Sequence, residues 1–173
     1  MNNSLRGGNV LNEIKVYSLA CFLGGLLRLI SCFVDYETAN ESIEILYIAT
    51  DLCLILGLIG FYSVYRTKLF WLGHLGFFVA ICGLSFIAGP ETEIFAASVY
   101  QIGSPIVGVG VLLLSLTLIR TNLCGFVAPV SLVASVLTGL VSMLVGGSLL
   151  LFITGALFGI GFMALAIQVW RSS

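Results

Sequence analysis

Long apolar segments, separated by short polar or glycine-rich breaks, run along the whole chain, and this pattern restricts its fold more than any other feature. Of the 173 residues, 60% are hydrophobic and only 9% are charged. An average soluble domain is about 25% charged, so this chain lacks the charge to cover a water-exposed surface. The low charge and cysteine content also exclude a disordered chain, a nucleic-acid-binding protein and a disulfide-stabilised secreted domain. The sequence therefore predicts a protein whose partner is the lipid bilayer.

The apolar segments have the number and length of six transmembrane helices. A helix needs about 20 residues to cross a hydrocarbon core about 30 Å thick. The predicted spans are residues 16–34, 43–65, 69–89, 94–119, 123–145 and 148–170. The first segment contains Arg28 and lacks a cleavage site of the A-x-A type, so we expect a retained helix. We expect a single all-α integral membrane domain with six transmembrane helices.

The weakest break between two spans is Gly146, Gly147 and Ser148. The apolar stretch from residue 123 to residue 170 is too long for one crossing, but it suits two crossings joined by a tight turn. We therefore expect the fifth helix to end and the sixth to begin at these glycines.

Basic residues lie on one side of the predicted topology. They are Arg6, Lys15, Arg66, Lys68, Arg120 and Arg171. Short loops that carry such residues tend to stay in the cytoplasm, whereas the loops at 35–44 and 91–93 are acidic. Aromatic residues such as Trp71 and Trp170 fall at the same boundary, where rings prefer the headgroup level. We expect both termini to be cytoplasmic and the protein to lie in the bacterial inner membrane.

Several residues recur about 54 positions further along the chain. The recurring pairs are Tyr47 and Tyr100, Gly57 and Gly110, and Arg66 and Arg120. A fainter third copy places Gly161 and Arg171 51 positions after Gly110 and Arg120. This pattern is consistent with three tandem helical hairpins. The alternative is that the ends of apolar helices favour the same residues by chance.

Two residues of opposite charge, Arg28 and Asp51, lie well inside consecutive predicted spans. At 1.5 Å per residue, Arg28 is about 9 Å and Asp51 about 12 Å from the outer ends of their helices. An unpaired charge inside the membrane costs about 2.5–3.5 kcal/mol. We therefore expect the two side chains to form a salt bridge in the outer leaflet.

Further polar residues at this depth predict an outward-facing pocket. Tyr47 lies one turn before Asp51. Pro105 lacks the N–H that would bond to the carbonyl of Gln101, so that carbonyl is free to accept. The predicted ligand-binding residues are Arg28, Tyr47, Asp51, Gln101 and Ser104. A small anion or zwitterion would suit such a pocket.

Two structural roles remain open for the same charges. In the first, Arg28 and Asp51 form a purely structural pair that holds the first helix against the second, with Gln101 capping the pair. Alternatively, Arg28 could extend to Asp35 at the surface, which would leave Asp51 protonated.

The glycines predict close helix packing, because helices in lipid associate through small residues and hydrogen bonds. Gly155 and Gly159 form a GxxxG pair in the last span. We expect this pair to pack within the chain. The alternative is an oligomer, with Gly155 and Gly159 at the seam of a homodimer.

No catalytic, metal-binding or cofactor-binding set of residues is evident in the sequence. His74 has no second histidine to share a metal or haem, and the five cysteines contain no C-x-x-C pair. We therefore favour a non-enzymatic protein that binds or passes a small polar solute. One alternative is a structural or regulatory subunit with a membrane-protein partner, and the other is an intramembrane enzyme that uses Asp51 as an acid or base.

Overall fold

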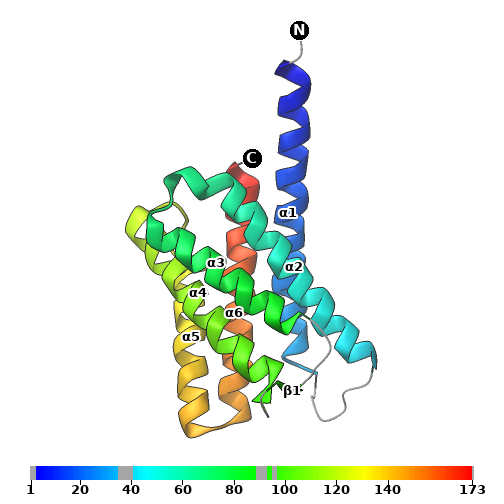
Figure 1. The fold of residues 1–173 in the computed structure, drawn as a ribbon, viewed down its shortest axis with the longest axis vertical. Helices are drawn as coiled ribbons and strands as arrows, with labels where there is room; N and C mark the ends of the chain where they lie inside the picture. The colour runs from blue at the N-terminus through cyan, green and yellow to red at the C-terminus, as the bar shows by residue number, and fades with distance from the viewer. Residues whose placement is uncertain (1–2, 35–40, 89–92, 95–96, 173) are drawn as a thin grey trace.

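The protein is a bundle of helices in a computed structural model that describes residues 3–34, 41–88, 93–94 and 97–172 (Figure 1). Within these residues there are six α-helices. They are α1 (Asn3–Ser31), α2 (Glu41–Tyr65), α3 (Trp71–Ile87), α4 (Val99–Thr121), α5 (Val127–Val145) and α6 (Ser148–Ser172). A 3-10 turn, η2 (Arg66–Lys68), follows α2, and two short strands, β1 (Glu93–Ile94) and β2 (Ala97–Ser98), precede α4.

Five of the helices in the described residues are long and apolar enough to cross a membrane, namely α1, α2, α4, α5 and α6. The sixth, α3, is apolar but has 17 residues. At 1.5 Å per residue it is about 25 Å long, which is shorter than the hydrocarbon core. The chain is therefore an all-helical protein of the multi-pass membrane type.

Several helix boundaries differ from the sequence prediction; α5, for example, begins at Val127 rather than residue 123. The fourth helix begins at Val99 rather than residue 94, because β1 pairs antiparallel with β2 and β2 leads directly into the helix. The first helix begins at Asn3 and extends beyond the end of the bundle where the C-terminus lies (Figure 1). It can do so because a helix that leaves the membrane forms its backbone hydrogen bonds internally in water as well.

The predicted break between the last two helices is confirmed. α5 ends at Val145 and α6 begins at Ser148. Gly146 and Gly147 have φ angles of 75° and 119°, values that residues other than glycine rarely adopt. These two residues reverse the chain direction.

Helices that follow one another in the chain run antiparallel and pack closely through glycine residues. In each of the pairs α1/α2, α3/α4 and α5/α6, at least one glycine of the second helix lies against the first helix. The contacts are Gly57 with Cys21, Gly110 with Ala80 and Gly161 with Leu132. A Cβ atom at any of these glycines would collide with its neighbour. Close backbone approach of this kind drives helix association in lipid, where burial of apolar surface contributes little.

α1 and α6 also pack directly on each other and close the bundle. Gly155 lies against the Sγ atom of Cys32, and Gly159 lies against the carbonyl oxygen of Gly25. Ser18 adds a hydrogen bond of 2.6 Å from its hydroxyl to the carbonyl of Ala166. Gly155 and Gly159 are thus buried inside the single chain, the intramolecular packing that the sequence analysis favours.

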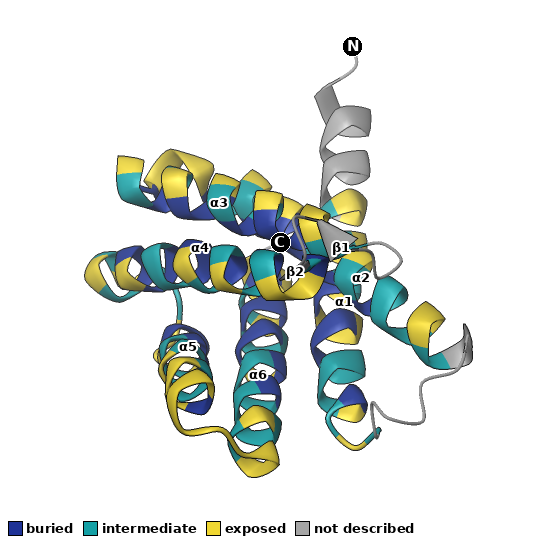
Figure 2. Ribbon diagram, turned by 60° about the horizontal axis from the view of Figure 1, so that its bottom comes forward, coloured by how far each residue is buried: buried dark blue, intermediate teal, exposed yellow. Residues whose placement is uncertain are grey.

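The helices carry both buried and exposed residues (Figure 2). Large apolar side chains occur in both groups. Phe61, Phe162 and Leu114 are fully buried between the helices. Every helix also exposes large apolar side chains, and Leu144 is 86% exposed. Water would disfavour so large an apolar surface, whereas lipid tails accept it.

Candidate functional site

The candidate site is centred on Arg28, a half-buried residue in the last turn of α1. Its Nη2 atom donates a hydrogen bond of 2.9 Å to the hydroxyl oxygen of Tyr100. The carbonyl oxygen of Arg28 accepts bonds from Ser31 Oγ at 2.8 Å and Cys32 Sγ at 3.2 Å. A carbonyl at a helix end lacks the usual partner, so these two bonds hold the end of α1 in place. They thereby hold the base of the Arg28 side chain.

Tyr100 is positioned by the beginning of α4. Ser98 is the N-cap of this helix, and its Oγ atom accepts a bond of 3.2 Å from the backbone N–H of Tyr100. A serine cap satisfies a backbone donor that has no partner inside the helix. The ring of Tyr100 is therefore presented from the first turn of α4 towards the end of α1.

The register between α1 and α2 places Arg28 close in depth to Asp51. Gly24 lies against Leu54, and the two helices are antiparallel. Four residues further along α1, Arg28 therefore lies level with Thr50, the residue before Asp51. The similar depths that the sequence predicts agree with this register.

The predicted salt bridge between Arg28 and Asp51 is nevertheless not formed. Among the described residues, the guanidinium has its hydrogen bond with Tyr100, and Asp51 attracts it only through a longer-range electrostatic interaction. Thr50 is fully buried, and the next residue points about 100° further around the helix. Asp51 consequently lies on a neighbouring face of α2, where it is half-buried. Similar depth was necessary for the salt bridge but not sufficient.

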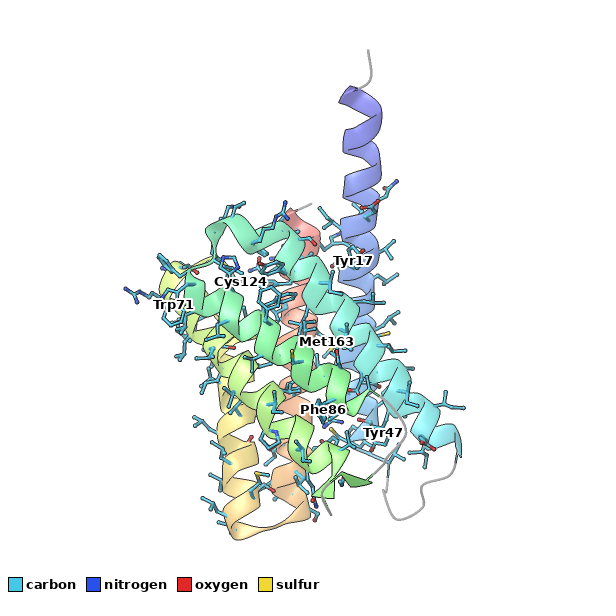
Figure 3. All side chains as sticks on the ribbon, in the orientation of Figure 1. Tyr17, Tyr47, Trp71, Phe86, Cys124 and Met163 are labelled. Atoms are coloured by element: carbon cyan, nitrogen blue, oxygen red, sulfur yellow. The ribbon has the colours of Figure 1, made fainter. Side chains whose placement is uncertain are left out.

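Tyr47 belongs to the same cluster of polar side chains. It lies one turn before Asp51 and interacts electrostatically with Arg28 and Tyr100. Figure 3 places Tyr47 near the end of the bundle opposite the C-terminus. The two tyrosines that recur in the sequence thus both approach Arg28.

Gln101 and Ser104, the other two predicted site residues, lie near the beginning of α4. Gln101 is exposed, and it points about 100° away from Tyr100 around α4. Ser104 lies one turn after Tyr100 on the same face and is half-buried. Within the described part of the chain, neither side chain has a hydrogen bond to Arg28.

Tyr100 is the residue of this site that the sequence analysis did not assign. Two signals could have identified it. It recurs at the position of Tyr47, and it shares a helix face with Ser104.

A second polar contact lies between α2 and α3. The hydroxyl of Tyr62 and Nδ1 of His74 are 2.9 Å apart. The Tyr62 ring also stacks on Phe77, with ring centres 4.0 Å apart and an angle of 11° between the planes. His74 is therefore an interface residue. In the residues that the structure describes, no three His, Cys, Asp or Glu side chains gather where they could hold a metal ion.

No protein-family model, curated protein or solved structure matches the chain. Its class therefore follows from its own helices, which are those of a multi-pass membrane protein. Within that class, the Arg28 site is the part of the molecule with the most distinctive chemistry.

Proposed function

We propose that this protein is a non-enzymatic protein of the bacterial inner membrane that binds a small anionic or zwitterionic solute at the Arg28 site. In this proposal all six helices cross the membrane as three tandem hairpins, with both termini in the cytoplasm. α3 counts as the sixth crossing because its glycines lie along α4: Gly76 is against Leu114, and Gly83 is against Val107. Gly57, Gly110 and Gly161, which recur once in each hairpin and pack against its first helix, support the repeat.

The single observation that carries the solute-binding proposal is the hydrogen bonding of the Arg28 guanidinium. A guanidinium has five N–H donors, and within the described residues its hydrogen-bond acceptor is the hydroxyl of Tyr100. A carboxylate or phosphate can accept two of these donors in a bidentate pair. Such a ligand would place a negative charge in direct contact with the Arg28 guanidinium, which Asp51 does not do.

Asp51 extends the proposal from anions to zwitterions. It lies near Arg28 in depth, on the neighbouring helix, and attracts the guanidinium without touching it. A ligand with a carboxylate on Arg28 and an ammonium on Asp51 would neutralise both groups. That arrangement would remove the cost of two uncompensated charges inside the membrane, about 2.5–3.5 kcal/mol each.

Ligand-dependent thermal unfolding of the full chain in zwitterionic nanodiscs tests this function. The probes are acetate, inorganic phosphate, glycine and glycine betaine. A probe at 100 times its Kd stabilises the folded state by about 2.7 kcal/mol. We expect at least one probe to raise the Tm of the unmodified protein and to have no effect on Arg28→Gln.

Two further variants test whether the ligand response depends on Arg28 and Asp51 specifically. Arg120→Gln removes an exposed arginine elsewhere and should keep the ligand response. Asp51→Asn should keep the response to acetate or phosphate and weaken the response to glycine. If no probe raises the Tm, or if Arg28→Gln responds like the unmodified protein, the binding function is wrong.

The second candidate is a structural role, which the Arg28–Tyr100 contact itself favours because it joins α1 to α4. In this case Arg28 and Tyr100 would be a clamp in a structural or regulatory subunit. Arg28→Gln would then lower the Tm, and no probe would shift the Tm of the unmodified protein.

A further inference from the structure

Exposed basic residues occur on the elements that meet at the end of the bundle that carries the C-terminus. This end is at the top of Figure 1. We call this group the basic rim. Its members are Lys15 on α1, Arg66 and Lys68 on η2, Arg120 on α4 and Arg171 on α6. It thus draws on four separate elements.

Three side-chain contacts bring these elements together at one end. They are Lys15 Nζ with the Trp170 ring at 5.7 Å, the Arg120 guanidinium with the Phe70 ring at 5.7 Å, and the Tyr65 hydroxyl with Ser172 Oγ at 2.7 Å. Arg66 follows Tyr65 directly, and Arg171 precedes Ser172. The segments that carry the five bases are therefore held together at this end of the bundle.

The positive charge of the rim is poorly balanced by nearby acids. Among the side chains that the structure describes, the acid at this end is Glu13, which is exposed. Five basic side chains are thus balanced by one carboxylate among the described residues at this end. A surface with this excess attracts anions.

Exposed aromatic rings lie among the bases. Phe70 is 55% exposed, Trp71 73% and Trp170 51%. Two of these rings contact a base of the rim through a cation–π interaction. Aromatic rings at helix ends sit at the level of lipid headgroups, so the bases beside them lie at the level of the phosphates.

We propose that the basic rim binds anionic phospholipid headgroups of the surrounding leaflet. Four of the bases lie at or just beyond the ends of apolar helices, and Lys15 lies near the start of the apolar span Asn12–Ser31. The aromatic rings beside them prefer the membrane interface, and this placement favours lipid over a soluble acidic partner. Each base near an anionic surface strengthens binding about fivefold. This site is separate from the Arg28 site, which lies in the last turn of α1, towards the opposite end of the bundle.

Lipid retention by the full chain tests the proposal. Nanodiscs are made with equal parts of phosphatidylglycerol and phosphatidylcholine, and native mass spectrometry then counts the lipids that stay bound. We expect phosphatidylglycerol to be enriched, and the enrichment to fall as ionic strength rises. In Arg66→Gln/Lys68→Gln, the preference should fall by up to about 25-fold, because two bases of about fivefold each are lost.

The matched control is Arg66→Lys/Lys68→Arg, which keeps both charges and should keep the preference. Arg66 and Lys68 are exposed, so both double variants should retain the Tm of the unmodified protein. Arg171→Gln is a second, independent removal of charge and should lower the preference about fivefold. Equal retention of the two lipids by the unmodified protein would overturn the proposal, as would an unchanged preference in the Gln variants. Tighter binding of soluble polyglutamate than of phosphatidylglycerol would identify the rim as a protein-binding surface instead.

Discussion

Arg28 and Tyr100 are 72 residues apart in the chain, yet Nη2 of the arginine donates a 2.9 Å hydrogen bond to the hydroxyl of the tyrosine. The bond connects the last turn of α1 to the first turn of α4. A charged donor makes this bond stronger than one between neutral groups. The contact therefore has consequences for stability that can be measured apart from any ligand.

Tyr100→Phe should destabilise the protein by about 1–3 kcal/mol, because it removes the acceptor of a partly buried guanidinium and leaves the ring. Thermal unfolding in detergent micelles would measure the change. Arg28→Leu and the double variant complete a cycle. If the bond accounts for the loss, the double variant is less destabilised than the sum of the single variants. Additive losses would show that Arg28 and Tyr100 act independently.

Gly110→Ala should destabilise the α3/α4 pair by about 1–3 kcal/mol, since the new methyl group would collide with the backbone of Ala80. Gly108, on the same helix, provides the control. A Cβ there meets only Val136, at 3.8 Å, which is ordinary contact. Gly108→Ala should be neutral or stabilise by up to about 1 kcal/mol, the difference in helix propensity. Equal effects of the two substitutions on unfolding would contradict glycine-mediated packing at Gly110.

Tyr62→Phe should cost about 0.5–1.5 kcal/mol, because the hydrogen bond to His74 is lost while the stack on Phe77 stays. Tyr62→Leu removes the stacked ring as well and should cost about 0.5–1.5 kcal/mol more. The control is Ser63→Ala, since Ser63 is exposed and its hydroxyl donates a hydrogen bond to the Ile59 carbonyl of its own helix. Unfolding free energies would rank Tyr62→Leu below Tyr62→Phe, and Tyr62→Phe below Ser63→Ala. A Tyr62→Phe variant as stable as the unmodified protein would rule out a contribution from the His74 contact.

Cys124, between α4 and α5, should resist thiol reagents at neutral pH (Figure 3). Burial raises the pKa of its thiol to about 11. Only the thiolate is nucleophilic, so alkylation should begin about two pH units later than at Thr67→Cys, an exposed position on η2. The unfolded chain ionises first, so this thiol also lowers stability as pH rises from about 9 towards about 11. Alkylation rates as a function of pH would measure the shift, and identical profiles would contradict the burial of Cys124.

The sequence by itself determined the membrane character of the protein, the number of apolar helices and the turn at Gly146 and Gly147. These features are local, because the length of an apolar segment and the freedom of a glycine backbone do not depend on distant residues. The relative depth of Arg28 and Asp51 could also be calculated from the sequence, because the calculation needs only the rise per residue of a helix.

Only the tertiary structure decided which partner the Arg28 guanidinium takes. Depth along a helix follows from counting residues, but the direction of a side chain depends on the rotation of each helix against its neighbours. That rotation is set where Gly24 meets Leu54 and where Gly25 meets Gly159. Tyr100 reaches Arg28 because β1, β2 and the Ser98 cap determine where α4 begins. Contacts between residues far apart in the chain thus select Tyr100 over Asp51, and no local pattern in the sequence contains that information.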